Sequence, residues 1–249
     1  LASGSVTLLL FLALSRPKRP VSKGNTLSAL MLFGYALCFS YAYMTLDTGT
    51  GALILFAAVQ GTMILANILK GQKIHWVEIF GFIIAFSGFV YLILPTLATP
   101  SLKGFALMLI SGIAWGIYTL RGSSSLAPLQ DTSFNFLRCM PIIIILLLIY
   151  SDKMAFSTEG FILATLSGSL ASGIGYTVWY YALRSLASLK AAVLQLLVPV
   201  LATAGGVIFT KEPISLRLTI STLLVLGGIA LVVLRKQIVK EKKLDPCKN

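Results

Sequence analysis

Hydrophobic residues in this chain come in runs of about 20, separated by short stretches that hold most of the polar and basic side chains. A helix needs roughly 20 apolar residues to cross the hydrocarbon core of a bilayer. Irregular backbone cannot face lipid, and the alternation of barrel strands is absent, so the runs predict transmembrane helices. We predict about nine spans, at Leu1–Ser15, Leu27–Leu46, Thr50–Leu69, Trp76–Leu94, Leu102–Leu120, Thr132–Tyr150, Gly160–Leu183, Leu189–Thr210 and Pro213–Leu234.

The last two spans have a weaker copy earlier in the chain. Lys190–Leu234 aligns without a gap on Thr50–Leu94, 140 positions earlier, and the alignment pairs Gly228 with Gly88. A set of spans that occurs twice is typical of transporters built from duplicated halves. Five spans per half is an odd number, so the repeat predicts an all-α polytopic membrane protein with two inverted five-helix repeats.

This repeat also predicts how the chain is divided. Residues 1–94 form a first repeat with four helices, 95–101 an inter-repeat loop, and 102–234 a second repeat with five helices. Residues 235–249 form a basic tail. The counterpart of Leu102–Leu120 would precede residue 1, so the simplest account is that this sequence lacks the first helix of a ten-helix architecture.

Composition agrees with a membrane protein. Hydrophobic residues make up 57% of the chain and charged residues 11%, whereas ordinary globular domains have about a quarter charged residues. The net charge of +12 comes from basic residues scattered among short loops, which fits lipid head groups and membrane orientation better than nucleic acid. We therefore expect the lipid bilayer as a partner and no nucleic acid.

The basic residues also predict an orientation. When the connections are assigned to alternate sides, fifteen of the twenty Lys and Arg residues fall on the side of the C-terminal tail and four on the other, while Arg138 lies within a span. An excess of Lys and Arg marks the cytoplasmic side. We expect the C-terminus to be cytoplasmic, in a bacterial plasma membrane.

Catalytic groups are scarce. The single histidine, His75, lies in a basic loop, and the acidic residues lie at span ends, in loops or in the tail. The sequence contains no HExxH motif, no paired carboxylates within spans and no Gly-rich lysine loop for nucleotide. These features predict no enzyme, no metal site and no cofactor, and they favour His75 as a polar residue at the interface.

Neutral polar and aromatic residues within the spans are better candidates for function. Trp115 and Tyr118 share one helix face, Tyr176 lies in the seventh span, and Gln195 and Pro199 lie four apart in the eighth. We hypothesise that these five residues line or shape a central cavity that stacks against and hydrogen-bonds a small organic solute.

An alternative explains the same residue types without a cavity. Buried amides such as Gln60 and Gln195 would join helices to one another, and aromatic residues would form a belt at the interface. We favour the belt for three residues near a span end, Trp179, Tyr180 and Tyr181. Arg138 has two readings as well: it snorkels to the nearby interface, which we favour, or it contacts a substrate carboxylate.

Several segments resemble the EamA-type transporters of the drug/metabolite transporter superfamily. The resemblance rests on Gly51–Leu94, on WGIYTL at Trp115–Leu120, on GYTVWYYAL at Gly175–Leu183, on LQLLVPVLATAGG at Leu194–Gly206, and on the KEP turn that leads to LVLGGIALVVL. It implies ten transmembrane helices in two inverted five-helix repeats. It also implies export of amino acids or other small metabolites.

We therefore expect a secondary transporter that exports a small organic metabolite, amino-acid-like in chemistry, by alternating access. A homodimer is left open. One alternative is a nucleotide-sugar or organophosphate antiporter, for which Lys190, Arg184 and Arg138 are the conceivable phosphate ligands. The other is a truncated membrane protein that does not transport, such as an assembly partner.

Overall fold

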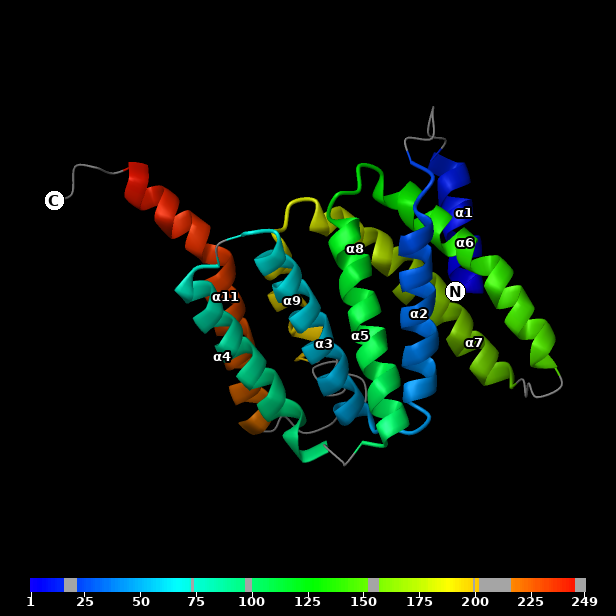
Figure 1. Ribbon diagram of the computed structural model, residues 1–249, viewed down its shortest axis with the longest axis horizontal. Helices are drawn as coiled ribbons and strands as arrows, with labels where there is room; N and C mark the ends of the chain where they lie inside the picture. Colours follow the sequence, from blue (N-terminus) through cyan, green and yellow to red (C-terminus); the bar gives the residue numbers. More distant parts are fainter. Residues whose placement is uncertain are drawn as a thin grey trace. The chain divides into compact units, whose positions relative to one another are not determined.

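A computed structural model of the chain describes residues 1–15, 22–72, 74–96, 100–151, 157–198, 200–201 and 216–244, with side chains except at 96 and 235–244. These residues form helices and no strand (Figure 1). The helices are α1 (Ala2–Ser15), α2 (Thr26–Ala42), α3 (Thr48–Leu69), α4 (Trp76–Ile93), η1 (Leu94–Thr96), α5 (Leu102–Gly122), α6 (Pro128–Ile149), α7 (Thr158–Leu166), η3 (Ser167–Ile174), α8 (Gly175–Leu183), α9 (Ser188–Gln195) and α11 (Leu216–Leu244).

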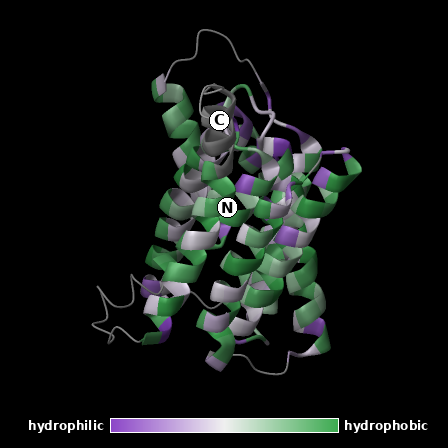
Figure 2. Cartoon of the chain, turned by 90° about the vertical axis from the view of Figure 1, so that its left-hand side faces the viewer, coloured by the Kyte–Doolittle hydropathy of each residue, from purple (hydrophilic) through white to green (hydrophobic). Residues whose placement is uncertain are grey.

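The described helices confirm an all-α polytopic membrane protein. Six helical segments are long and apolar enough to cross a membrane: Thr48–Leu69, Trp76–Ile93, Leu102–Gly122, Pro128–Ile149, Thr158–Leu183 and Leu216–Leu234. The first two predicted spans appear as the shorter apolar helices α1 and α2. Hydrophobic residues cover most of the helical surface (Figure 2).

Two predicted spans differ in extent from the described helices. The eighth span begins as α9, but Pro199 and residues 202–215, which include the KEP turn, lie outside the described residues. The sixth span was predicted from Thr132, and α6 begins one turn earlier, at Pro128. Proline suits the first turn of a helix because it has no backbone N–H to satisfy there.

The seventh span is not a uniform α-helix. Between α7 and α8 the backbone forms the π-helical segment η3, in the small-residue sequence SGSLASGI. Small residues let this segment approach α1: a Cβ placed on Gly4 would lie 2.6 Å from the carbonyl oxygen of Gly168. The predicted span at Gly160–Leu183 is present, but the π segment separates two α-helical parts and changes the angular position of the residues of α8 relative to those of α7.

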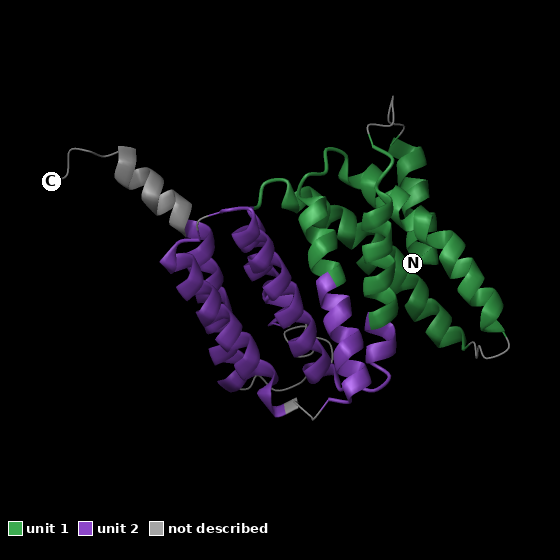
Figure 3. Ribbon diagram, in the orientation of Figure 1, with its two compact units in different colours: residues 1–38, 114–186 green, residues 39–113, 187–249 purple. Residues whose placement is uncertain are grey.

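Contacts divide the chain into two compact units (Figure 3). Unit 1 comprises Leu1–Cys38 and Ala114–Leu186, and unit 2 comprises Phe39–Ile113 and Ala187–Asn249. Each unit takes residues from both of the predicted repeats. The division of the chain at 95–101 follows the sequence repeat and stays a prediction.

Unit 2 pairs helices that the sequence repeat also pairs. α4 packs along α11, and α3 packs against α9 (Figure 1). The aligned glycines Gly88 and Gly228 both lie in the α4–α11 contact, where a Cβ on Gly88 would be 2.6 Å from Leu224 Cβ. Contacts between repeat-related helices are what a pseudo-twofold axis produces, so they agree with the predicted inverted repeats.

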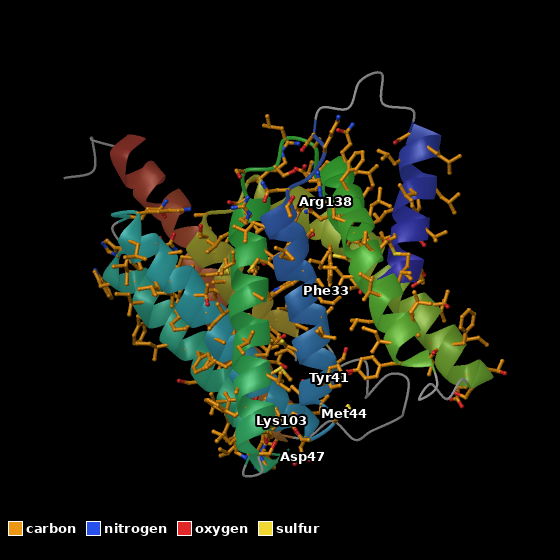
Figure 4. The ribbon with its side chains drawn as sticks, turned by 45° about the vertical axis from the view of Figure 1, so that its right-hand side comes forward. Phe33, Tyr41, Met44, Asp47, Lys103 and Arg138 are labelled. Carbon is orange, nitrogen blue, oxygen red and sulfur yellow. The ribbon has the colours of Figure 1, made fainter. Side chains whose placement is uncertain are left out.

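Charged residues lie at helix ends in unit 2, as expected for spans in lipid. Asp47 precedes α3, and Lys103 lies in the first turn of α5 (Figure 4). His75 caps α4: its Nδ1 accepts from the backbone N of Val77 at 3.3 Å, and its own backbone N donates to Glu78 Oε2 at 3.0 Å. This capping box satisfies backbone N–H groups at the helix start, which gives His75 a structural role.

Candidate functional site

Four helices of unit 1 bring their aromatic side chains to one place. We name this group the aromatic cluster. It consists of Tyr35 from α2, Trp115 and Tyr118 from α5, Phe136 from α6, and Tyr176 and Tyr180 from α8.

Trp115 lies at the middle of the cluster. Its ring centroid is 4.7 Å from that of Tyr35, 4.7 Å from that of Tyr176 and 5.6 Å from that of Tyr118. Tyr118 in turn lies 4.8 Å from Tyr180. Separations of 4.5–7 Å are the favourable range for aromatic pairs, so the rings support one another.

Burial differs across the cluster. Tyr118 and Phe136 are 0% exposed and Tyr180 is 2% exposed, whereas Tyr35, Trp115 and Tyr176 keep part of their surface uncovered. Tyr118, Phe136 and Tyr180 therefore form the buried part of the cluster, and Tyr35, Trp115 and Tyr176 form its partly exposed part. Aromatic rings are surfaces on which a flat or apolar solute can stack.

Three of the five predicted lining residues therefore meet. Trp115, Tyr118 and Tyr176 are all members of the aromatic cluster. Gln195 belongs to unit 2, and Pro199 lies outside the described residues. A cavity that all five residues line stays a prediction.

Two buried amides of unit 2 lie between α3 and α9. Gln60 Nε2 donates to the carbonyl oxygen of Ala192 at 2.7 Å. Gln195 is 6% exposed, and its Nε2 lies 3.5 Å from Met63 Sδ and 3.4 Å from the carbonyl oxygen of Ala191. Gln60 thus joins two helices, as the alternative to a cavity predicted for buried amides.

Tyr180 was expected in an interfacial belt, and that interpretation is wrong. Its ring is buried, and its hydroxyl donates to the carbonyl oxygen of Tyr118 at 3.2 Å. Its neighbour Trp179 donates from Nε1 to Thr119 Oγ1 at 3.4 Å. Tyr181 is 52% exposed, and for it the belt stays a prediction.

Next to the cluster, unit 1 contains a polar cavity of about 390 Å³. We name it the polar cavity. The residues that carry its chemistry are Asn25, Ser28, Arg121, Asp131, Asn135 and Tyr180. Tyr180 belongs to both the cavity and the cluster, so the two features are continuous.

Hydrogen bonds hold the acid of the cavity in place. The Asp131 carboxylate accepts from the hydroxyl groups of Ser22 and Ser125. The backbone N of Asn25 donates to Asn135 Oδ1 at 2.9 Å. These bonds tie the segment before α2 to the start of α6, so that wall of the cavity is ordered by polar contacts.

Arg121 is a cavity residue that the sequence reasoning missed. It was counted only as a loop charge, but its side chain is half-buried in the cavity, and its Nε donates to Ser28 Oγ at 2.9 Å. One signal was available. Arg121 follows Tyr118 by three residues and so lies on the same face of α5.

The other cations considered as phosphate ligands are placed differently. Arg138 lies near the middle of α6 and donates to the backbone carbonyl of Lys23, in the segment before α2. Its interfacial interpretation stays a prediction. Lys190 Nζ donates to the carbonyl oxygen of Val233 at 2.7 Å, and Arg184 is exposed. Within the described part of the chain, no three His, Cys, Asp or Glu side chains gather as a metal site would require.

Similar proteins support a transporter. An uncharacterized protein of Pseudomonas aeruginosa is 45% identical over 232 residues, which cover 93% of this chain and 81% of that protein. An uncharacterized transporter of Archaeoglobus fulgidus is 30% identical over 217 residues, covering 84% of this chain and 77% of its own. The uncharacterized transporter YoaV of Bacillus subtilis is 21% identical over 240 residues, which cover 91% of this chain and 82% of that protein.

A solved structure shares the fold. One crystal structure superposes with a TM-score of 0.78 at 16% identity and covers 94% of this chain and 84% of that one. Residues 102–234 match the EamA-like transporter family. The chain therefore belongs to the EamA-like transporter family and is a multi-pass membrane transporter of the drug/metabolite transporter superfamily.

Proposed function

We propose that this protein is a secondary transporter that exports a small organic metabolite, amino-acid-like in chemistry, by alternating access. The observation that carries the proposal is the aromatic cluster of unit 1. Its partly exposed rings, Tyr35, Trp115 and Tyr176, adjoin a polar cavity through Tyr180. Apolar walls with a few well-placed polar groups are the usual make-up of a small-molecule site.

The cluster is suited to a solute with a flat or apolar part. An aromatic pair contributes about 0.5–1.5 kcal/mol beyond the area it buries. Contacts of this size favour weak binding and ready release, which a transporter needs in each cycle. Polar groups of the cavity would then orient the solute, because hydrogen bonds depend on direction more than stacking does.

Close helix contacts at small residues support movement of one group of helices against another. Gly4, Gly168 and Gly173 place the backbones of α1 and η3 side by side. Such contacts contain no long side chains that must disengage when helices shift. The excess of basic residues on the side of the tail supports a cytoplasmic C-terminus.

Flux measurements test the proposal. The protein is reconstituted in liposomes loaded with a broad panel of metabolites, and efflux is followed for each solute. We expect solute-specific efflux that falls about tenfold in Trp115→Ala, equivalent to roughly 1.4 kcal/mol of lost interaction. Trp76→Ala is the matched control, because Trp76 is 69% exposed at the start of α4.

The outcomes differ clearly. An equal loss of efflux in the two tryptophan variants would show that the cluster is not part of the transport pathway. A panel without any protein-dependent flux would contradict the proposed function itself. Efflux that depends on Trp115 and not on Trp76 supports both the function and its place in unit 1.

A further inference from the structure

We propose that the polar cavity of unit 1 is a carboxylate site in which Arg121 binds a carboxylate group of the transported solute. The inference rests on the proposed function and names the charged group that the solute carries. Arg121 stands in a cavity of about 390 Å³ and is held from one side by Ser28, across 2.9 Å. Ser28 is itself 4% exposed, so this support is fixed.

The contact with Ser28 uses Nε and leaves the two Nη groups of the guanidinium as donors for a ligand. Among the described residues, the Arg121 side chain makes no other hydrogen bond and no ion pair. A planar guanidinium fixed at Nε presents donors in the geometry of a carboxylate. A half-buried cation without a direct counter-ion gains most from a ligand that supplies one.

The acid in the same cavity does not neutralise Arg121 by direct contact. Asp131 accepts hydrogen bonds from Ser22 and Ser125, and among the described residues no ion pair joins it to Arg121. Its negative charge in the cavity also disfavours a second large negative charge. One guanidinium beside one carboxylate therefore fits a monoanion better than a phosphate dianion.

Other cations near the cavity favour an anion on approach. Lys23 lies between two residues of the cavity wall, and Arg138 contacts its carbonyl. Positive charge near the mouth of a cavity raises the local concentration of anions. Arg121 would then select among the anions that enter.

Tyr180 links this charge site to the aromatic cluster. Its ring lies 4.8 Å from Tyr118, and the same side chain lines the cavity. A solute with a carboxylate and an apolar or aromatic body can use both features. Phenylacetate is therefore a suitable probe, and phenylacetamide is its neutral counterpart of nearly equal shape.

Binding is measured by isothermal titration calorimetry on the purified protein in detergent. We expect phenylacetate to bind at least about tenfold more tightly than phenylacetamide, and to lose about tenfold in affinity in Arg121→Gln. Arg121→Lys keeps the charge but not the planar fork, so we expect an intermediate loss. Arg184→Gln removes the same charge from an exposed position and should change the affinity less than about twofold.

Each other outcome overturns the inference. If Arg121→Gln and Arg184→Gln weakened phenylacetate binding equally, the effect would come from the overall positive potential of unit 1 and not from a specific contact with Arg121. Equal binding of phenylacetate and phenylacetamide would remove the carboxylate from recognition. Tighter binding of phenyl phosphate than of phenylacetate would replace the carboxylate site by a phosphate site.

The two proposals can fail separately. Efflux of neutral solutes, with no carboxylate binding, would leave the transport function and reject the carboxylate site. Carboxylate binding that depends on Arg121, with no flux of any solute, would support the carboxylate site and reject the transport function. Circular dichroism of each variant, compared with the unmodified protein, shows whether the helices are intact.

Discussion

The hydroxyl group of Tyr180 in α8 donates a hydrogen bond to the backbone carbonyl of Tyr118 in α5, across 3.2 Å. Both side chains are buried, at 2% and 0% exposure. The ring of Tyr180 occupies the space beside Gly122, where a Cβ would lie 2.5 Å from its Cδ1 atom. One glycine thus makes room for the residue that joins the aromatic cluster to the polar cavity.

Gly122→Ala should displace the Tyr180 ring and destabilise the protein by about 1–3 kcal/mol, the usual cost of overpacking. Thermal unfolding in detergent measures the effect. Gly34→Ala in α2 is the control, because nothing lies within 4 Å of a Cβ placed there. We expect that control to be neutral or stabilising by up to ~1 kcal/mol. Similar losses in both variants would contradict the packing described for Tyr180.

Tyr180→Phe keeps the ring and removes the hydrogen bond, so we expect a loss of about 1 kcal/mol. Tyr180→Ala also empties the space beside Tyr118 and should cost about 3–5 kcal/mol. Denaturant unfolding in mixed micelles gives both values. An alanine variant as stable as the phenylalanine variant would show that the ring does not fill a close-packed site.

Two adjacent glycines in α11 should respond differently to the same change. A Cβ on Gly228 would lie 2.6 Å from the backbone N of Ala85 in α4, whereas a Cβ on Gly227 has nothing within 4 Å. Gly228→Ala should therefore destabilise unit 2 by about 1–3 kcal/mol. Gly227→Ala should be neutral or slightly stabilising, since alanine is the better helix former. Their melting temperatures, recorded side by side, decide the matter, and the opposite order would exclude close α4–α11 packing.

Gln60 and Gln195 allow the helix-joining and the cavity roles to be separated. Gln60→Met removes the 2.7 Å bond to Ala192, so we expect about 1 kcal/mol of lost stability and unchanged flux. Gln195→Met should lower flux about tenfold if Gln195 lines the transport pathway, equivalent to roughly 1.4 kcal/mol. Flux and unfolding are measured on the same preparations. Unchanged flux in Gln195→Met would take Gln195 out of the predicted lining.

Most of the helical architecture could be predicted from hydrophobic runs, because a span in lipid must be long, apolar and closed in its hydrogen bonds. The helical geometry within a span, α or π, was harder to predict. Small residues such as Gly168 and Gly173 suit both α and π geometry, so η3 leaves no mark in the pattern. The π segment packs against α1, a contact that the sequence does not show.

The site was predictable where spacing carried information. Trp115 and Tyr118 were placed on one face by their separation of three residues, and the structure puts both in the aromatic cluster. Position near a span end misled the interpretation of Tyr180, because depth along a helix does not say which face a residue occupies. Tyr35 lies among other aromatic residues of α2, such as Phe33 (Figure 4), and nothing in the sequence separates them.

The π segment changes the angle at which side chains leave the axis of the seventh span. A π turn uses about one residue more than an α turn, and one residue corresponds to about 100° around the helix axis. Upstream of it, α7 contacts α1, and downstream Tyr176 and Tyr180 enter the aromatic cluster. The π geometry of Ser167–Ile174 therefore sets the angle between the face of the span that packs against α1 and the face that carries Tyr176 and Tyr180 into the aromatic cluster.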